Sequence, residues 1–264
     1  EIRPRDWSSD VCSSDLIGWD EVGLDVGEVV DHFAGLLDPQ LTQRVVDGLA
    51  SERANPMWGF DAIYCINLDD RTDRWEAMQR QFDRLGIAER VRRFPAVETP
   101  DNHHVGCALS HAAVLREARA HGLESVLILE DDVAFLEGAL WCLRRSLAEL
   151  EDRQWNVLYL GGHRWQQVFK RPKGCDALEI PRGLTCAHAI AYHRRSYDRI
   201  LADLPSTVDE ATAWLDRGIA YDQYLPTVFR SGVYLTRPAI ATQYSIKGRS
   251  EEHTSELQSR GLIS

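Results

Sequence analysis

Short apolar runs alternate with helical segments through the middle of the chain, and this alternation constrains the fold more than any other feature. Strands are expected at 62–68, 91–97, 126–129 and 156–160, and helices at 72–85, 105–121 and 138–150. The run at 126–129 is apolar throughout, which is typical of a strand covered on both faces. The alternation therefore predicts an α/β fold with a mostly parallel sheet and helices on both faces.

Three carboxylates, Glu130, Asp131 and Asp132, follow directly on the strand predicted at 126–129. Like charges this close repel each other unless a cation lies among them. Ligands of parallel α/β sheets bind beyond the carboxyl ends of the strands, and Mg²⁺ and Mn²⁺ prefer oxygen ligands there, completed by water and substrate phosphates. The motif predicts a hard-cation site. The alternative is a turn in which Asp132 caps a helix and the other two acids are solvated.

The overall composition argues against several classes of protein. The formal net charge of −11 argues against a nucleic-acid binder, which usually carries a basic stripe. No apolar run approaches the roughly 18 residues of a membrane-spanning helix, so membrane contact is expected to be peripheral at most. The six cysteines contain no CxxC pair, which argues against a structural zinc site and favours a reduced, cytoplasmic setting.

The two ends of the sequence differ from the rest. Residues 6–16 and 249–259 are rich in serine and acids and show neither helical nor strand periodicity. The second segment reads as the translation of a common short-read sequencing adapter, and the first as the translation of its reverse complement. We therefore interpret residues 1–16 and 249–264 as adapter-derived artefacts. Disordered tails are the alternative interpretation.

Five segments, in the same order, resemble glycosyltransferase family 25, which includes bacterial lipooligosaccharide galactosyltransferases and collagen galactosyltransferases. They are INLDDRTDRW (66–75), GCALSHAAVLREA (106–118), LILEDDV (127–133), NVLYLGG (156–162) and TCAHAIAY (185–192). We take residues 61–246 as the glycosyltransferase domain, and residues 17–60 as a helical lead-in or the tail of an upstream domain. The resemblance implies a GT-A-like (Rossmann-like) fold, a UDP-sugar donor carrying galactose or glucose, and inversion at the anomeric carbon.

The resemblance also implies roles for particular residues. Asp132, the last acid of the triplet, is expected to bind Mn²⁺ or Mg²⁺, with Glu130 beside it at the metal and Asp131 orienting water or donor hydroxyls. Further donor contacts are expected at Asn67, Arg71, Arg74, His111, Gly161 and Gly162. A solvated helix position for Arg74 and a packing role for His111 are the alternatives.

An inverting transferase needs a general base that takes the proton from the acceptor hydroxyl. Asp222, in AYDQYL, stands where the family carries an Asp late in the domain. A helix cap or a surface ion pair are its alternative roles, and Asp209 is a weaker candidate for the base. Cys107 is expected in the core, whereas Cys186 and His188 stand where small or aromatic residues are expected.

Together these residues predict an inverting, metal-dependent glycosyltransferase that moves a hexose from a UDP-sugar to a glycan or glycolipid acceptor of the lipooligosaccharide type. The alternative is a catalytically silent nucleotide-sugar or carbohydrate-binding domain of the same fold. The donor sugar and the acceptor depend on pocket shape and a few hydrogen bonds, which one sequence does not reveal.

Overall fold

The computed structural model describes residues 55–164, 170–181, 184–218 and 220–243. The helices expected between residues 17 and 54 and both adapter-like ends lie outside these ranges. No helix in the described ranges is both long enough and apolar enough to cross a membrane.

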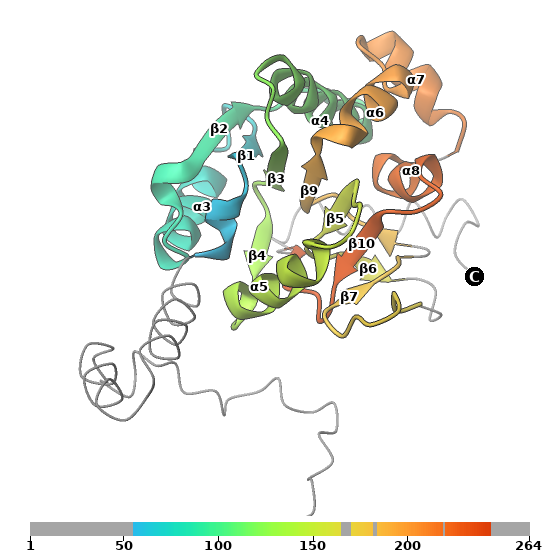
Figure 1. The fold of residues 1–264 in the computed structure, drawn as a ribbon. Coiled ribbons are helices and arrows are strands. Elements are labelled where there is room, and N and C mark those ends of the chain that lie inside the picture. The colour runs from blue at the N-terminus through green and yellow to red at the C-terminus, as the bar shows by residue number, and fades with distance from the viewer. Residues whose placement is uncertain (1–54, 165–169, 182–183, 219, 244–264) are drawn as a thin grey trace, which may run out of the picture. The chain divides into compact units, whose positions relative to one another are not determined.

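A seven-stranded sheet with the order β2-β1-β3-β9-β5-β10-β7 forms the centre of the described fold (Figure 1). Its strands are β1 (Ala62–Asn67), β2 (Val91–Pro95), β3 (Ser125–Glu130), β5 (Val157–Tyr159), β7 (Leu178–Glu179), β9 (Ala189–His193) and β10 (Val233–Thr236). β1 pairs in parallel with β2 and β3, and β5 pairs in parallel with β10. β9 lies antiparallel between β3 and β5, so these two strands point the same way. Five strands therefore share one direction, which confirms the predicted α/β class with a largely parallel sheet.

Helices cover both faces of the sheet, as predicted. On one face α4 (His103–Ala120), α6 (Tyr197–Asp203), α7 (Val208–Leu215) and α8 (Tyr221–Val228) pack over the side that carries Val126 and Ile128. On the other face α3 (Thr72–Arg84), α5 (Ala139–Leu150) and η1 (Pro56–Gly59) cover Leu127 and Leu129. β3 is thus apolar on both faces because both are buried, as the run at 126–129 indicated.

Two glycines follow the C-terminal ends of α3 and α4, and the N-terminus of α3 has an unusual cap. Gly86 and Gly122 follow α3 and α4 with φ of 63° and 66°, which is the left-handed conformation that a side chain disfavours. Thr72 is a residue type that often caps a helix, but Arg71 holds the N-cap position of α3 and makes no side-chain cap bond. Thr72 is instead the first residue of the helix.

Two small sheets extend the fold beside the acidic motif. β4 (Val133–Phe135) begins directly after Asp132 and pairs antiparallel with β11 (Ala241–Gln243). β6 (His163–Arg164) pairs with β8 (Leu184–Thr185). The short turns η2 (Ala88–Arg90) and η3 (Arg194–Ser196) complete the described elements. The β4–β11 pair matters for the site because it brings the end of the described chain next to Asp132.

Close backbone packing at the end of β5 gives a stability prediction. A Cβ added to Gly161 would lie 1.8 Å from the carbonyl oxygen of Ala241 and 2.8 Å from Nε2 of His188. We expect Gly161→Ala to lower the free energy of unfolding by about 3 kcal/mol, because buried backbone cannot move aside. Urea unfolding measures this change. Gly59→Ala is the control, since its Cβ meets nothing within 4 Å, and an equal loss in both variants would contradict the explanation.

Candidate functional site

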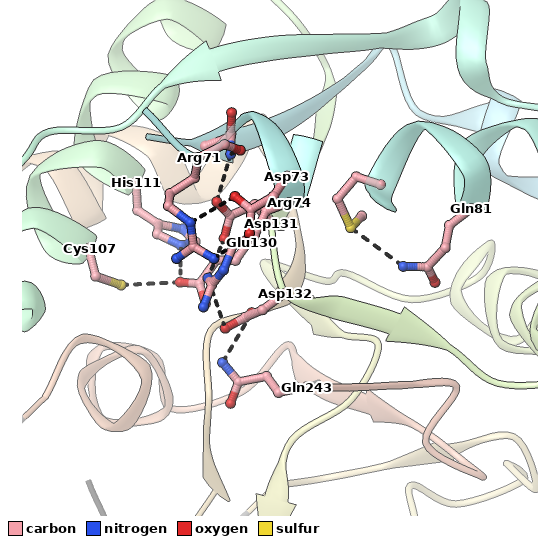
Figure 2. A network of polar contacts seen from close by, with 12 residues as sticks. Arg71, Asp73, Arg74, Gln81, Cys107, His111, Glu130, Asp131, Asp132 and Gln243 are labelled. Atoms are coloured by element: carbon pink, nitrogen blue, oxygen red, sulfur yellow. Dashed lines mark hydrogen bonds and ion pairs between the residues drawn. The ribbon is translucent and has the colours of Figure 1, made fainter. Parts of the chain in front are cut away.

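Several of the predicted site residues lie close together at the carboxyl ends of the parallel strands, which we call the ligand edge of the sheet. Ile66 of β1 pairs with Glu130 of β3, so the ends of these strands lie side by side. β9 enters at the same edge because it runs antiparallel to β3. The backbone N–H of Glu130 donates to the carbonyl of His188, just before β9, at 2.9 Å. Segments distant in sequence therefore meet around the acidic motif, as ligand sites in α/β sheets usually do (Figure 2).

Asp131 is held by two side chains that the sequence assigned to donor binding. Nδ2 of Asn67 donates to one carboxylate oxygen at 2.7 Å, and Nη1 of Arg74 donates to the other at 2.7 Å. Asn67 is itself fixed, because its Nδ2 also donates to the carbonyl of Arg71 and its Oδ1 accepts from Arg93. Asn67, Arg74 and Asp131 thus form one rigid group at the ends of β1 and β3. The solvated role considered for Arg74 does not fit this contact.

The carboxylate of Asp132 has only distant polar partners among the described residues. Arg74 reaches it only at 3.7 Å, and Nε2 of Gln243 donates to it at 3.4 Å. Burial, followed by the negative charges of Glu130 and Asp131, raises the pKa of Asp132 to about 7, although Arg74 opposes the shift. Asp132 is therefore a carboxylate that an added cation would stabilise.

This raised pKa predicts how stability depends on pH without divalent cations. The pKa of Asp132 lies above the ordinary carboxyl value of 3.8, so ionisation destabilises the fold. The destabilisation is absent below about pH 4, grows as the pH rises towards 7, and is constant above that. We expect Asp132→Asn to raise the free energy of unfolding at pH 8, by at most about 4 kcal/mol, and to leave it unchanged at pH 3. Denaturant titrations at both pH values measure the difference, and equal effects at the two pH values would contradict it.

Glu130 faces α4 rather than Asp132. Side chains alternate along a strand, so Glu130 lies on the same face as Ile128, which α4 covers. Sγ of Cys107 donates to Oε1 of Glu130 at 3.3 Å, and Nε2 of His111 lies 3.3 Å from the same oxygen. Burial alone would raise the pKa of Glu130, but the hydrogen bond and charge of His111 lower it on balance. The donor atoms of this triad lie within 4.8 Å of one another, close enough to hold one metal ion.

Three predicted donor residues have local roles in the structure. Arg71 forms a two-bond ion pair with Asp73, with N–O distances of 2.9 and 2.8 Å, and this partner lowers the pKa of Asp73 to about 2. Gly161 packs against the backbone of β11, and a Cβ on Gly162 would lie 2.6 Å from the side chain of Leu184. Among the described contacts, none links these three residues to the acidic motif by a hydrogen bond or ion pair.

Asp222 lies near the start of α8 and holds the segment before β9. One of its carboxylate oxygens accepts a short hydrogen bond from the backbone N–H of Cys186, and the other accepts from the backbone N–H of Gln223 at 2.8 Å. Cys186 has a φ of 84°, which is uncommon for a residue with a side chain. Burial raises the pKa of Asp222, and the charge of Glu130 adds to the shift. Asp222 is therefore a buried acid at the edge of the site with a raised proton affinity.

The sequence interpretation missed several residues around these acids. Cys107 was assigned to the core for want of a neighbouring base, yet Glu130 and His111 both lie beside it. The signal was available, since positions four apart on a helix share a face. His188 is 2% exposed, and its ring nitrogens make no hydrogen bond of standard geometry with a described residue. Burial lowers the pKa of His188, although the charge of Glu130 and the nearby backbone of Ala241 oppose the shift. Gln243 gave no signal, because only the β4–β11 pairing brings it to Asp132.

Known proteins resemble this chain at the level of a family. The family model described as glycosyltransferase family 25 (LPS biosynthesis protein) matches residues 101–180. Inactive glycosyltransferase 25 family member 3 of Homo sapiens is 29% identical over 198 residues, which are 65% of this chain and 32% of that protein. Procollagen galactosyltransferase 1 of Danio rerio is 27% identical over 163 residues, covering 52% of this chain and 26% of that protein.

A solved structure, of a glycosyltransferase involved in the glycosylation of the major capsid of PBCV-1, aligns with 74% of this chain and 98% of its own, at 11% identity and a TM-score of 0.43. The chain spans about a third of the human relative and about a quarter of the zebrafish one. The names of these relatives include both an inactive protein and a galactosyltransferase. The family model and the curated relatives agree on one family, so this chain is similar to glycosyltransferase family 25.

Proposed function

We propose that the chain transfers a hexose, galactose or glucose, from a UDP-sugar to a glycan or glycolipid acceptor of the lipooligosaccharide type, with inversion and with Mn²⁺ or Mg²⁺ as cofactor. Similarity to family 25 supports the class of reaction. In this proposal the protein acts in the cytoplasm, with at most peripheral membrane contact. The observation that carries the proposal is Asp132, an acid with a pKa of about 7 among two other acids at the end of β3.

The residues of this edge fit a hard divalent cation. Asp132 offers carboxylate oxygens that Gln243 and Arg74 compensate only at 3.4 and 3.7 Å. One or two protein carboxylates suffice for such a cation, because water and phosphate oxygens fill its other positions. The cation would neutralise the diphosphate as it leaves, which is Lewis-acid assistance. Asp131 cannot move freely to join in, since Asn67 and Arg74 hold it.

The chain's own residues supply the remaining chemistry. Asp222, with its raised pKa, accepts the proton of the acceptor hydroxyl as that oxygen attacks the anomeric carbon. The new bond forms on the face opposite the leaving UDP, which departs with the electron pair of the broken bond. Asn67 and Arg74 keep the ends of β1 and β3 in register, so that the donor meets a preorganised edge.

The second candidate is a catalytically silent domain that binds a nucleotide sugar or a carbohydrate. It is favoured by the human relative, which is named inactive. UDP release from UDP-galactose, with Mn²⁺ and a lipooligosaccharide acceptor, separates the two candidates when calorimetric binding of UDP is measured alongside. Metal-dependent release above the rate without protein supports the transferase. UDP binding without release supports the silent domain.

A further inference from the structure

We propose that Cys107, His111 and Glu130 form a binding site for Zn²⁺, distinct in its chemistry from the hard-cation role of Asp132. The triad joins two elements: Cys107 and His111 come from α4, and Glu130 comes from the end of β3. The proposal does not rest on the proposed function, because it concerns a cation that the protein binds whether or not it transfers a sugar.

The geometry of the triad suits one small ion. Oε1 of Glu130 lies 3.3 Å from Sγ of Cys107 and 3.3 Å from Nε2 of His111, and all three donor atoms lie within 4.8 Å of one another. Zinc bonds of about 2.3 Å to sulfur and about 2.1 Å to nitrogen place tetrahedral ligand atoms roughly 3.6 Å apart. The triad therefore needs shifts of only a few tenths of an ångström at two of its edges.

The donor types select the metal. A thiolate and an imidazole are ligands that Zn²⁺ binds well, whereas Mg²⁺ and Mn²⁺ prefer oxygen. The charges also balance, since one thiolate and one carboxylate neutralise a divalent cation in a site where the His111 side chain is fully buried. Three protein ligands leave a fourth tetrahedral position open, and the Glu130 side chain, 21% exposed, is the member of the triad through which the ion would enter.

Surrounding hydroxyl groups support the imidazole in the tautomer that zinc requires. Nδ1 of His111 lies 3.5 Å from the hydroxyl of Tyr192, which is 2.9 Å from the hydroxyl of Tyr221. When Nδ1 carries the proton and donates to Tyr192, the lone pair of Nε2 is free for the metal, and Tyr192 donates onward to Tyr221. Such outer partners fix ring orientation at metal sites.

The proton balance follows from these states. Glu130 binds zinc as a carboxylate and His111 binds it as a neutral imidazole. The Cys107 thiol loses one proton to solvent as its sulfur bonds to zinc, so each ion bound releases at least one proton. Affinity for Zn²⁺ is therefore expected to rise at least about tenfold per pH unit while the free thiol is protonated.

The test uses Co²⁺ as a spectroscopic probe for this site. Chelator-treated protein titrated with Co²⁺ is expected to gain a near-ultraviolet thiolate-to-cobalt absorption band that saturates at one equivalent, and Zn²⁺ is expected to remove it. Cys107→Ser should abolish the band. His111→Gln should weaken Zn²⁺ affinity by about 100-fold or more, since loss of an outer partner alone costs about 10–100-fold. Competition with a chromophoric chelator measures that affinity.

Cys175→Ser is the matched control, because Cys175 is also buried but lies in the core on the opposite face of the sheet from α4. It should keep the band unchanged. Wild-type protein that shows no thiolate band at saturating Co²⁺ overturns the proposal, and so does a band that survives in folded Cys107→Ser. Where circular dichroism shows that this variant does not fold, the wild-type spectrum and the proton released per Zn²⁺, measured by calorimetry in two buffers, decide the question.

Discussion

Asp132→Asn is expected to lower the kcat/KM of metal-dependent UDP release by at least about 100-fold. The amide keeps the size of the side chain but removes the negative charge, and electrostatic assistance from a bound cation contributes several kcal/mol to such reactions. UDP release from UDP-galactose at saturating Mn²⁺ measures the effect. The apparent affinity for Mn²⁺, followed by calorimetry in the presence of UDP, should fall in parallel.

Two features make this loss easy to interpret. Asp132→Asn is expected to be more stable than the wild type at pH 8, so lower activity would not reflect unfolding. Asp198→Asn on α6 is the matched control, since Asp198 is 90% exposed and pairs only with Arg119 among the described residues. Turnover of Asp132→Asn at the wild-type rate would show that the metal assignment is wrong.

Asp222→Asn is expected to lower kcat by about 10²–10⁴-fold, the usual range for loss of a general base. The substitution removes the group that accepts the acceptor's proton, and it also replaces one carboxylate oxygen by an amide NH2 group. Only one of the two hydrogen bonds from the backbone N–H groups of Cys186 and Gln223 therefore persists. The free energy of unfolding should fall by about 1–3 kcal/mol, whereas the affinity for UDP should change little. The pH profile of kcat/KM in the wild type should rise through the raised pKa of Asp222.

Asp209→Asn tests the weaker candidate for the base. Asp209 lies in the first turn of α7, next to the capping box that Thr207 and Glu210 form. We expect this variant to keep its kcat within a few-fold of the wild type. A rate for Asp222→Asn within a few-fold of the wild type would leave Asp222 with a structural role alone, as the partner that holds Cys186.

The sequence predicted the strands and helices that depend on local patterns. β1, β3, α3, α4 and α5 were expected within a few residues of their observed limits, because apolar periodicity and terminal glycines are local signals. The sequence also predicted where the site lies, because ligands of parallel α/β sheets bind beyond the carboxyl ends of the strands. Glu130 was expected beside Asp132 at the metal, whereas it faces α4, as the alternation of side chains along a strand requires for a residue two after Ile128.

The rest of the site depends on contacts between distant residues. β9 was not predicted as a strand between β3 and β5, because an apolar run such as AIAY carries no information about its neighbours or its direction. Gln243 reaches Asp132 across 111 positions, and Asp222 reaches Cys186 across 36. The packing role of Gly161 likewise arises from β11, which sequence patterns alone did not place.

The reversed direction of β9 has a consequence for where this chain can change its sequence. Because β9 enters at the edge where the other strands leave, the segment 186–188 stands over the site as a connection rather than as part of the sheet. In this connection Cys186 is partly exposed, whereas Ala187 and His188 are buried, and exposed connecting positions tolerate replacement best. On the proposed function, we expect substitutions at Cys186 to shift sugar preference while the acids of β3 stay intact, so that selectivity changes independently of those acids.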